Sequence, residues 1–286
     1  MGLINTLSCI FCILFSFLSL TCANTLNMWL FLELSVLSVV PCFFINYVYS
    51  NYYKGLLYYL LLSGVGSGLI FSGFLLVNEG GNLISFIGFL IKFCLFPVGF
   101  WIYIVGNSVS WVVIWLITCC SKICSPLLSV LFSQDYYFSC SNTLCGMSFL
   151  FCGLYFWFGV SNLNTLWINM SVASGCVLFL LFIYSNSFIS YILLVFYFIW
   201  SSLCIYIISN LNGFYSVYSS SYIMFSLYSI PLSLSFLYKI LSVFSLIYCS
   251  IPWGLIFLFF FYGLSEQYYL FKSWGFLWST GDGNIF

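Results

Sequence analysis

The chain has 286 residues, of which 64% are hydrophobic and only 3% are charged, and its five basic and five acidic residues give a net charge of zero. Soluble domains carry about 25% charged residues, so a water-exposed surface of ordinary chemistry is excluded. We therefore expect an integral membrane protein, with membrane lipids and no nucleic acid among its partners.

Long apolar segments follow one another along the chain, separated by short polar breaks such as VNEGGN and SQDYYFS. Each is close to the roughly 20 residues that a helix needs to cross a hydrocarbon core of about 30 Å. Helices are expected because lipid offers no partner for a free backbone N–H or C=O group. The sequence thus predicts an all-α integral membrane protein with about ten transmembrane helices. They are expected at residues 2–22, 27–49, 54–77, 82–104, 109–132, 139–160, 165–184, 187–209, 221–247 and 251–272.

The breaks between the expected helices leave no room for an extramembrane domain. Residues 1–286 are interpreted as a single integral membrane domain with a short polar C-terminal tail at 273–286. The chain contains no arginine and no histidine, but 35 phenylalanines and 23 tyrosines. This bias is typical of a coding strand poor in C, as in compact organelle genomes. The first apolar segment lacks the basic region of a signal peptide and is interpreted as the first helix.

Fourteen cysteines are scattered through the apolar segments, and two groups, CIFC and CCSKIC, resemble ligand motifs. Both groups lie inside expected helices, whereas a zinc or iron–sulfur site needs four converging ligands. The favoured interpretation is that these cysteines act as small hydrophobic residues. No metal and no cofactor are expected to bind to this chain.

Four ionisable residues within the expected helices have apolar turns on both sides: Glu33, Lys92, Lys122 and Lys239. A charged residue at the centre of a membrane helix costs about 2.5 to 3.5 kcal/mol, so each is a candidate functional residue. Lys54 and Glu266 lie nearer to expected helix ends, from which a side chain can reach the membrane surface. The remaining charges are expected in loops, at helix ends or in the tail: Glu79, Asp135, Lys272 and Asp282.

The balance of charge among the four central residues bears on their role. One carboxylate stands against three lysines, so at most one pair can be neutral. The other lysines would need water, backbone carbonyls or the loss of a proton to lie in the membrane. A proton or ion path is therefore favoured over the alternative that one lysine–glutamate pair only fixes helix packing.

A proline accompanies each of the four central charges: Pro41, Pro97, Pro126 and Pro231. Pro126 cannot donate to the carbonyl of Lys122, four residues earlier, because it has no backbone N–H. Pro97 similarly frees the carbonyl of Phe93, next to Lys92. Broken helices beside buried charges are typical of transporters, where they line a wet cavity near the middle of the membrane. We expect interrupted helices at these prolines.

Five segments carry a family resemblance through their order and spacing: WLFLELSVLSVVP, YYKGLLYYLLLSGVGSGLI, FLIKFCLFPVGFW, SWVVIWLITCCSKICSPLLSV and IPLSLSFLYKILS. They resemble subunit 2 of mitochondrial NADH:ubiquinone oxidoreductase, or respiratory complex I. The resemblance covers most of residues 26–245. Its most specific elements are Lys92 and Lys122, each followed by a proline within the same segment.

The resemblance implies an antiporter-like bundle with proline-broken helices, related to cation/proton antiporters, in the mitochondrial inner membrane. It implies that Glu33 pairs with Lys92 in the proton-input half of the bundle. Lys122 would be the central relay lysine and Lys239 the lysine of the second broken helix. Lys54 is a further candidate with a less settled role. The chain would be a core, non-redox subunit that couples quinone reduction to proton translocation.

The resemblance also implies that electron transfer takes place elsewhere. NADH, flavin, iron–sulfur clusters and ubiquinone are expected in other subunits, and the partners are other membrane subunits of complex I. One alternative is a stand-alone secondary cation/proton antiporter. Another is a structural membrane subunit without a proton path, or a receptor, although the short uncharged loops argue against a receptor. Gly99 stands where the family has a histidine, so a relay would use water or tyrosine there.

Overall fold

The computed structural model describes residues 2–44, 52–76, 79–132, 135–184, 188–211, 226–231 and 233–280. Within these ranges the chain is almost entirely helical and has no strand. Six helical segments of the described chain are long and apolar enough to cross a membrane, and shorter apolar helices accompany them. The expected all-α membrane bundle is thus confirmed.

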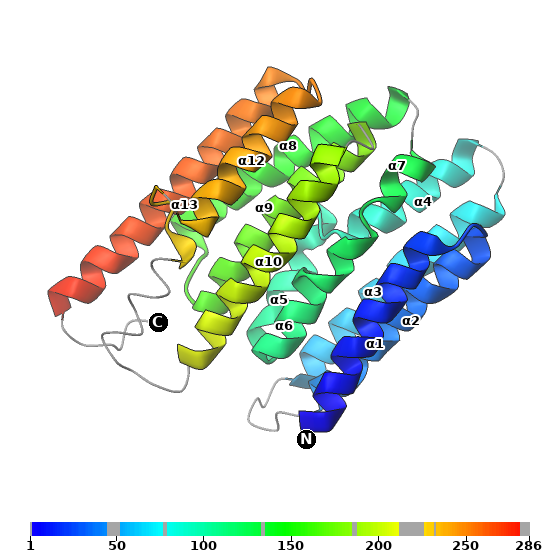
Figure 1. Cartoon of the computed structure of the whole chain (residues 1–286), viewed down its shortest axis with the longest axis horizontal. Helices are drawn as coiled ribbons and strands as arrows, with labels where there is room; N and C mark the ends of the chain where they lie inside the picture. Colours follow the sequence, from blue (N-terminus) through cyan, green and yellow to red (C-terminus); the bar gives the residue numbers. More distant parts are fainter. Residues whose placement is uncertain are drawn as a thin grey trace.

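The helices lie side by side in one bundle, with the first and the last described helices on opposite edges (Figure 1). One edge is formed by α1 (Gly2–Thr21), α2 (Thr25–Phe43) and α3 (Tyr52–Leu75). The other edge contains α8 (Asp135–Phe158), α12 (Leu234–Tyr248) and α13 (Trp253–Thr280). The helix α10 (Phe188–Leu211) lies between these groups.

The centre of the bundle is α9, Leu163–Tyr184. Every residue from Thr165 to Ile183 is buried, and the helix packs against α8, α10, α12 and two shorter helices. A helix that is apolar on all sides belongs inside a bundle, because no face of it favours water. The polar side chains that α9 does carry are therefore placed in the core.

Two of the expected helices are interrupted. The first interrupted segment comprises α4 (Glu79–Lys92), the 3₁₀ turn η1 (Val98–Phe100) and α5 (Trp101–Ser108). The second comprises α6 (Trp111–Thr118), the 3₁₀ turn η2 (Cys120–Cys124) and α7 (Leu127–Leu131). Pro97 directly precedes η1 and Pro126 directly precedes α7, as expected for residues that cannot continue the hydrogen-bond pattern of a helix. Cys94, in the first break, has a left-handed φ of 57°.

The C-terminal third differs from the expected helix boundaries. The helix expected at 221–247 begins only at Leu234, because Ser233 caps it by accepting a hydrogen bond from the Phe236 N–H at 3.2 Å. Pro231 lies in the turn before this helix, and residues 212–225 are outside the described ranges. The tail expected at 273–286 is helical as far as Thr280, because α13 continues that far. Residues 281–286 are outside the described ranges.

Pro41 lies within a helix, whereas Pro97, Pro126 and Pro231 lie at breaks or turns between helices. Pro41 lies inside α2, which continues for two more residues and ends at Phe43. The backbone N–H of Phe44 donates to the carbonyl of Pro41 and closes the helix. The rest of the helix expected at 27–49 lies outside the described ranges.

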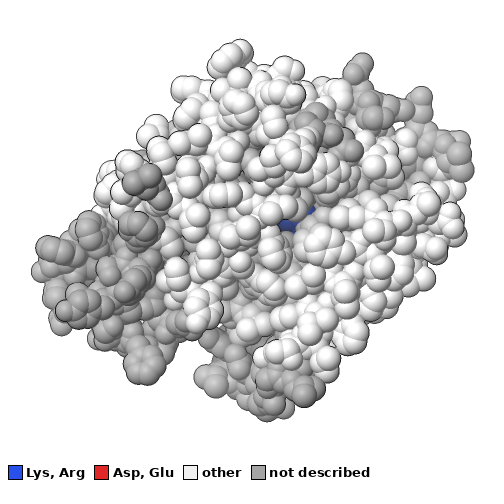
Figure 2. Space-filling view, viewed as in Figure 1, with Lys and Arg blue, Asp and Glu red and all other residues white. Residues whose placement is uncertain are grey.

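The surface of the bundle is apolar. In Figure 2 almost all described atoms on the visible face belong to uncharged residues. Large hydrophobic side chains are exposed along α1, α3, α10, α12 and α13. Such a surface is stable against lipid and unstable against water, so it agrees with a multi-pass membrane protein.

Candidate functional site

Lys122 is the most completely enclosed lysine among the described residues. It lies in η2, at the break between α6 and α7, and is 5% exposed. Its Nζ donates to the carbonyl of Ser171, to Ser174 Oγ at 3.0 Å and to the Tyr197 hydroxyl at 2.8 Å. The same Nζ lies 4.4 Å from the centre of the Tyr197 ring.

These contacts fit a charged ammonium group that has no counter-ion. The Ser174 hydroxyl donates to the Ser171 carbonyl at 2.8 Å, and the Tyr197 hydroxyl donates to the Thr118 carbonyl at 3.1 Å. With the hydroxyls donating in this way, both can accept from Lys122, and an ammonium has one proton for each of its three partners. No carboxylate of the described chain lies within ion-pair distance of this nitrogen.

The local sequence explains how Lys122 is held. Pro126 cannot engage the Lys122 carbonyl, and Ser125 takes it instead through a 3₁₀ hydrogen bond of 3.0 Å. Gly175 on α9 leaves the space for the end of the lysine side chain. A Cβ atom at Gly175 would lie 3.3 Å from Lys122 Cε and 3.5 Å from the carbonyl oxygen of Phe93.

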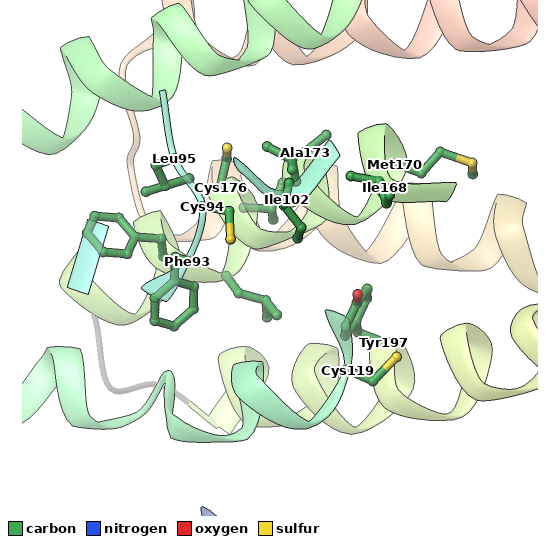
Figure 3. Close-up of a cluster of buried hydrophobic side chains, with 14 of the residues drawn as sticks. Phe93, Cys94, Leu95, Ile102, Cys119, Ile168, Met170, Ala173, Cys176 and Tyr197 are labelled. Atoms are coloured by element: carbon green, nitrogen blue, oxygen red, sulfur yellow. The ribbon is translucent and has the colours of Figure 1, made fainter. Parts of the chain in front are cut away.

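The first helix break also packs against α9. In Figure 3, Cys94 and Leu95 lie beside Cys176 of α9, while the hydroxyl end of Tyr197 is directed towards α9. The side chain of Phe93 packs edge-to-face on Phe179 of α9, with ring centres 5.5 Å apart. Both helix breaks therefore meet on the central helix, close to Lys122.

Lys92 is the last residue of α4 and is half-buried. It lines a pocket of about 50 Å³ together with polar side chains of four other elements. The polar lining residues are Ser16, Ser35, Tyr59, Ser63, Ser121 and three cysteines, Cys12, Cys120 and Cys124. A cavity of this size with hydroxyl groups in its wall is large enough for several water molecules.

Glu33 and Lys92 are not in contact, contrary to the expected pair. Glu33 is half-buried on α2, and its Oε2 atom has no hydrogen-bond partner among the described residues. The single ion pair of the described chain lies elsewhere. Lys92 is nevertheless within electrostatic range of the Glu33 carboxylate, so a side-chain movement or a bridging water would be needed to link them.

The ion pair is formed by Lys239 and Glu266. Lys239 Nζ donates to Glu266 Oε1 at 2.9 Å and joins α12 to α13. Gln267 Nε2 donates to the same oxygen at 3.3 Å. The Glu266 side chain is 1% exposed and that of Lys239 is 20% exposed.

The interpretation of Glu266 as a residue that reaches the membrane surface was wrong. It lies halfway along α13, which runs from Trp253 to Thr280, and its carboxylate is directed into the bundle. The charge count changes accordingly, because two buried or half-buried carboxylates accompany the three central lysines. The polar pair Glu266 and Gln267 in an otherwise apolar helix was the available signal.

The two remaining sequence candidates lie at the margins of this site. Lys54 is exposed in the first turn of α3. Gly99 is buried in η1, and a Cβ atom there would lie 2.1 Å from the carbonyl oxygen of Cys94. No side chain fits at this position without a backbone shift.

The described residues contain no group of three or more histidine, cysteine or acidic side chains arranged to hold a metal ion. All fourteen cysteines are free thiols. The candidate site therefore consists of ionisable and hydroxyl side chains distributed across the bundle. Such groups can accept, hold and pass protons.

No protein-family model matches the sequence, and the comparison with curated proteins found no match. Solved structures do resemble the fold. A chain of respiratory complex I from Thermus thermophilus, determined with bound aureothin, aligns with a TM-score of 0.74 and 17% identity over 90% of this chain. A chain of the Mrp complex from Dietzia sp. DQ12-45-1b aligns with a TM-score of 0.77 and 13% identity over 91% of this chain.

A third similar structure is that of the membrane-bound sulfane sulfur reductase, an archaeal respiratory membrane complex. Its TM-score is 0.67 with 13% identity over 87% of this chain. The alignments cover 66%, 58% and 61% of the three matched chains, so this chain spans about three fifths to two thirds of their length. The chain therefore shares its fold with a membrane chain of each of these three complexes.

Proposed function

We propose that the chain is a proton-translocating, non-redox subunit of a proton-pumping NADH:ubiquinone oxidoreductase, equivalent to subunit 2 of mitochondrial complex I. It works in the inner membrane beside other membrane subunits, and it binds none of the redox cofactors itself. Glu33 and Lys92 form the input side, Lys122 the central relay, and Lys239 with Glu266 the far side. The family-like sequence segments and the fold shared with a complex I chain support this proposal.

The setting of Lys122 is the observation that carries the proposal. A lysine kept only for packing would be neutralised by a carboxylate, because an unpaired charge in a membrane is costly. Lys122 instead has three neutral oxygen partners from α9 and α10 at a helix break. A group held in this way can release its proton without leaving an unpaired carboxylate behind.

Replacement of Lys122 by methionine tests the proposal. The variant keeps the volume of the side chain and removes the proton-binding nitrogen. Its hydroxyl neighbours stay satisfied, since Ser174 and Tyr197 already donate to carbonyls. We expect assembly to persist and the number of protons moved per NADH oxidised to fall. Lys272→Met, an exposed lysine on α13, is the matched control. Unchanged proton movement in Lys122→Met would overturn the proposal.

A stand-alone cation/proton antiporter is the second candidate function. The fold is shared as closely with a chain of the Mrp complex, at a TM-score of 0.77, as with the complex I chain, at 0.74, so it is equally compatible with a membrane protein outside complex I. The two candidates differ in assembly. A complex I subunit migrates with NADH dehydrogenase activity on a native gel, whereas an independent antiporter exchanges cations for protons after purification alone and reconstitution into vesicles.

A further inference from the structure

A gap separates the two parts of the proposed relay. Lys122 is bound to α9 and α10, whereas Lys239 and Glu266 join α12 to α13. No hydrogen bond of the described chain connects the two groups directly. A proton that leaves Lys122 therefore needs at least one further group to reach Glu266.

Tyr238 occupies the position between them. It directly precedes Lys239 on α12, and consecutive residues of a helix point about 100° apart. Lys239 reaches α13, while Tyr238 faces α10, with its ring 5.9 Å from that of Tyr197. Since α12 packs on both α9 and α10, one turn of this helix contacts both halves of the relay.

The Tyr238 hydroxyl is buried and has no hydrogen bond to any described residue. The residue is 5% exposed. Its hydroxyl lies close to the Ser174 hydroxyl, but not in the geometry of a formed hydrogen bond, and it is within electrostatic range of the Glu266 carboxylate. Ser174 in turn accepts from Lys122 Nζ at 3.0 Å.

Packing alone does not account for this hydroxyl. The Tyr238 ring stacks on Trp200, with centres 4.9 Å apart and planes 6° from parallel. Phenylalanine would stack in the same way and would avoid burying a polar atom without a partner. An unpartnered hydroxyl between a proton donor and a carboxylate is instead suited to proton transfer.

We propose that Tyr238 carries protons between Lys122 and the Lys239–Glu266 pair. This proposal rests on the proposed function of the chain. In the transfer, an N–H bond of Lys122 breaks as an O–H bond forms on Ser174. Ser174 passes its own proton to the Tyr238 oxygen, and Tyr238 passes its proton to Glu266. Each hydroxyl ends with one proton, Lys122 becomes a neutral amine, and Glu266 becomes a neutral acid that releases Lys239.

Both hydroxyls must turn for this transfer to occur. Ser174 leaves the Ser171 carbonyl, to which it donates in this structure, and turns towards Tyr238. Tyr238 turns towards Glu266 while its ring remains stacked on Trp200. These are side-chain rotations about single bonds, so the backbone of α9 and α12 can stay in place.

The test is Tyr238→Phe in the assembled membrane complex, reconstituted into vesicles and measured with a pH-sensitive dye. Tyr103→Phe is the matched control, because it also removes a buried hydroxyl, one that donates to Asn169 Oδ1 at 2.7 Å. Loss of a positioned proton-transfer group slows its step by about 100-fold or more. We expect that loss in Tyr238→Phe, with a larger solvent deuterium isotope effect, and near-normal proton movement in Tyr103→Phe.

The possible outcomes separate this proposal from the proposed function. Slow transfer in both Tyr238→Phe and Lys122→Met, with an active Tyr103→Phe, supports the role of Tyr238. Normal transfer in Tyr238→Phe with slow transfer in Lys122→Met overturns that role alone. Normal transfer in both variants overturns the proposed function as well. If Tyr238→Phe does not assemble, Ser174→Ala interrupts the same transfer one step earlier, and a normal rate in that variant overturns the proposal.

Discussion

Loss of the counter-ion of Lys239 should destabilise the chain measurably. Glu266→Gln keeps the shape of the side chain but leaves the ammonium of Lys239 without a negative partner. A single charged residue at the centre of a membrane helix costs about 2.5 to 3.5 kcal/mol, and breaking a fully buried pair costs about 3 to 5 kcal/mol. Lys239 keeps 20% of its side-chain exposure, which places the expected loss near 2 to 3 kcal/mol.

A double variant separates the charge effect from loss of packing. Lys239→Met with Glu266→Gln removes both charges, and we expect its stability to lie within about 1 kcal/mol of the unmodified chain. The assay is thermal unfolding of the assembled complex in lipid nanodiscs, with Lys272→Met on α13 as the control for loss of an exposed lysine. A stable Glu266→Gln variant, or a double variant weaker than Glu266→Gln alone, would refute this reasoning.

Three further substitutions test the helix break and the input side. Gly99→Ala places a Cβ atom 2.1 Å from the Cys94 carbonyl and should cost about 1 to 3 kcal/mol in thermal unfolding. Gly68→Ala, whose new atom meets nothing within 4 Å, should be neutral or stabilising by up to about 1 kcal/mol. Equal losses in these two variants would contradict the close contact at Gly99. Glu33→Gln should leave the melting temperature unchanged or raised while proton movement falls, because Oε2 has no partner to lose. A large loss of stability would instead show that Glu33 is part of a structural ion pair.

The helices were predictable because hydrophobic length alone determines which segments can cross a membrane. The break near Pro97 was predictable too, since a missing backbone donor must interrupt the hydrogen bonds of a helix. The interruption before α12 was expected at Pro231, but the first residue of α12 was not predictable, because it depends on a single cap at Ser233. Boundaries set by one hydrogen bond leave little trace in composition.

The partners of the charged residues were harder to predict than their positions. Glu266 was misplaced because the expected end of its helix was eight residues too early, at 272 where α13 continues to Thr280. Its partner, Lys239, was predicted to be a central lysine, but no carboxylate was assigned to it. The oxygens around Lys122 come from Ser171 and Ser174 on α9 and Tyr197 on α10, and only packing brings these helices together.

The environments of Lys122 and Glu266 set a direction for proton movement. Deprotonated Lys122 has two protons for three acceptors, so it loses one hydrogen bond but leaves no buried charge unpaired. Deprotonated Lys239 would leave the carboxylate of Glu266, 1% exposed, without a counter-ion. Lys122 is therefore the lysine that releases a proton at the lower electrostatic cost. Glu266 can accept that proton only as its bond to Lys239 weakens, so each transfer towards α13 is coupled to the opening of the ion pair.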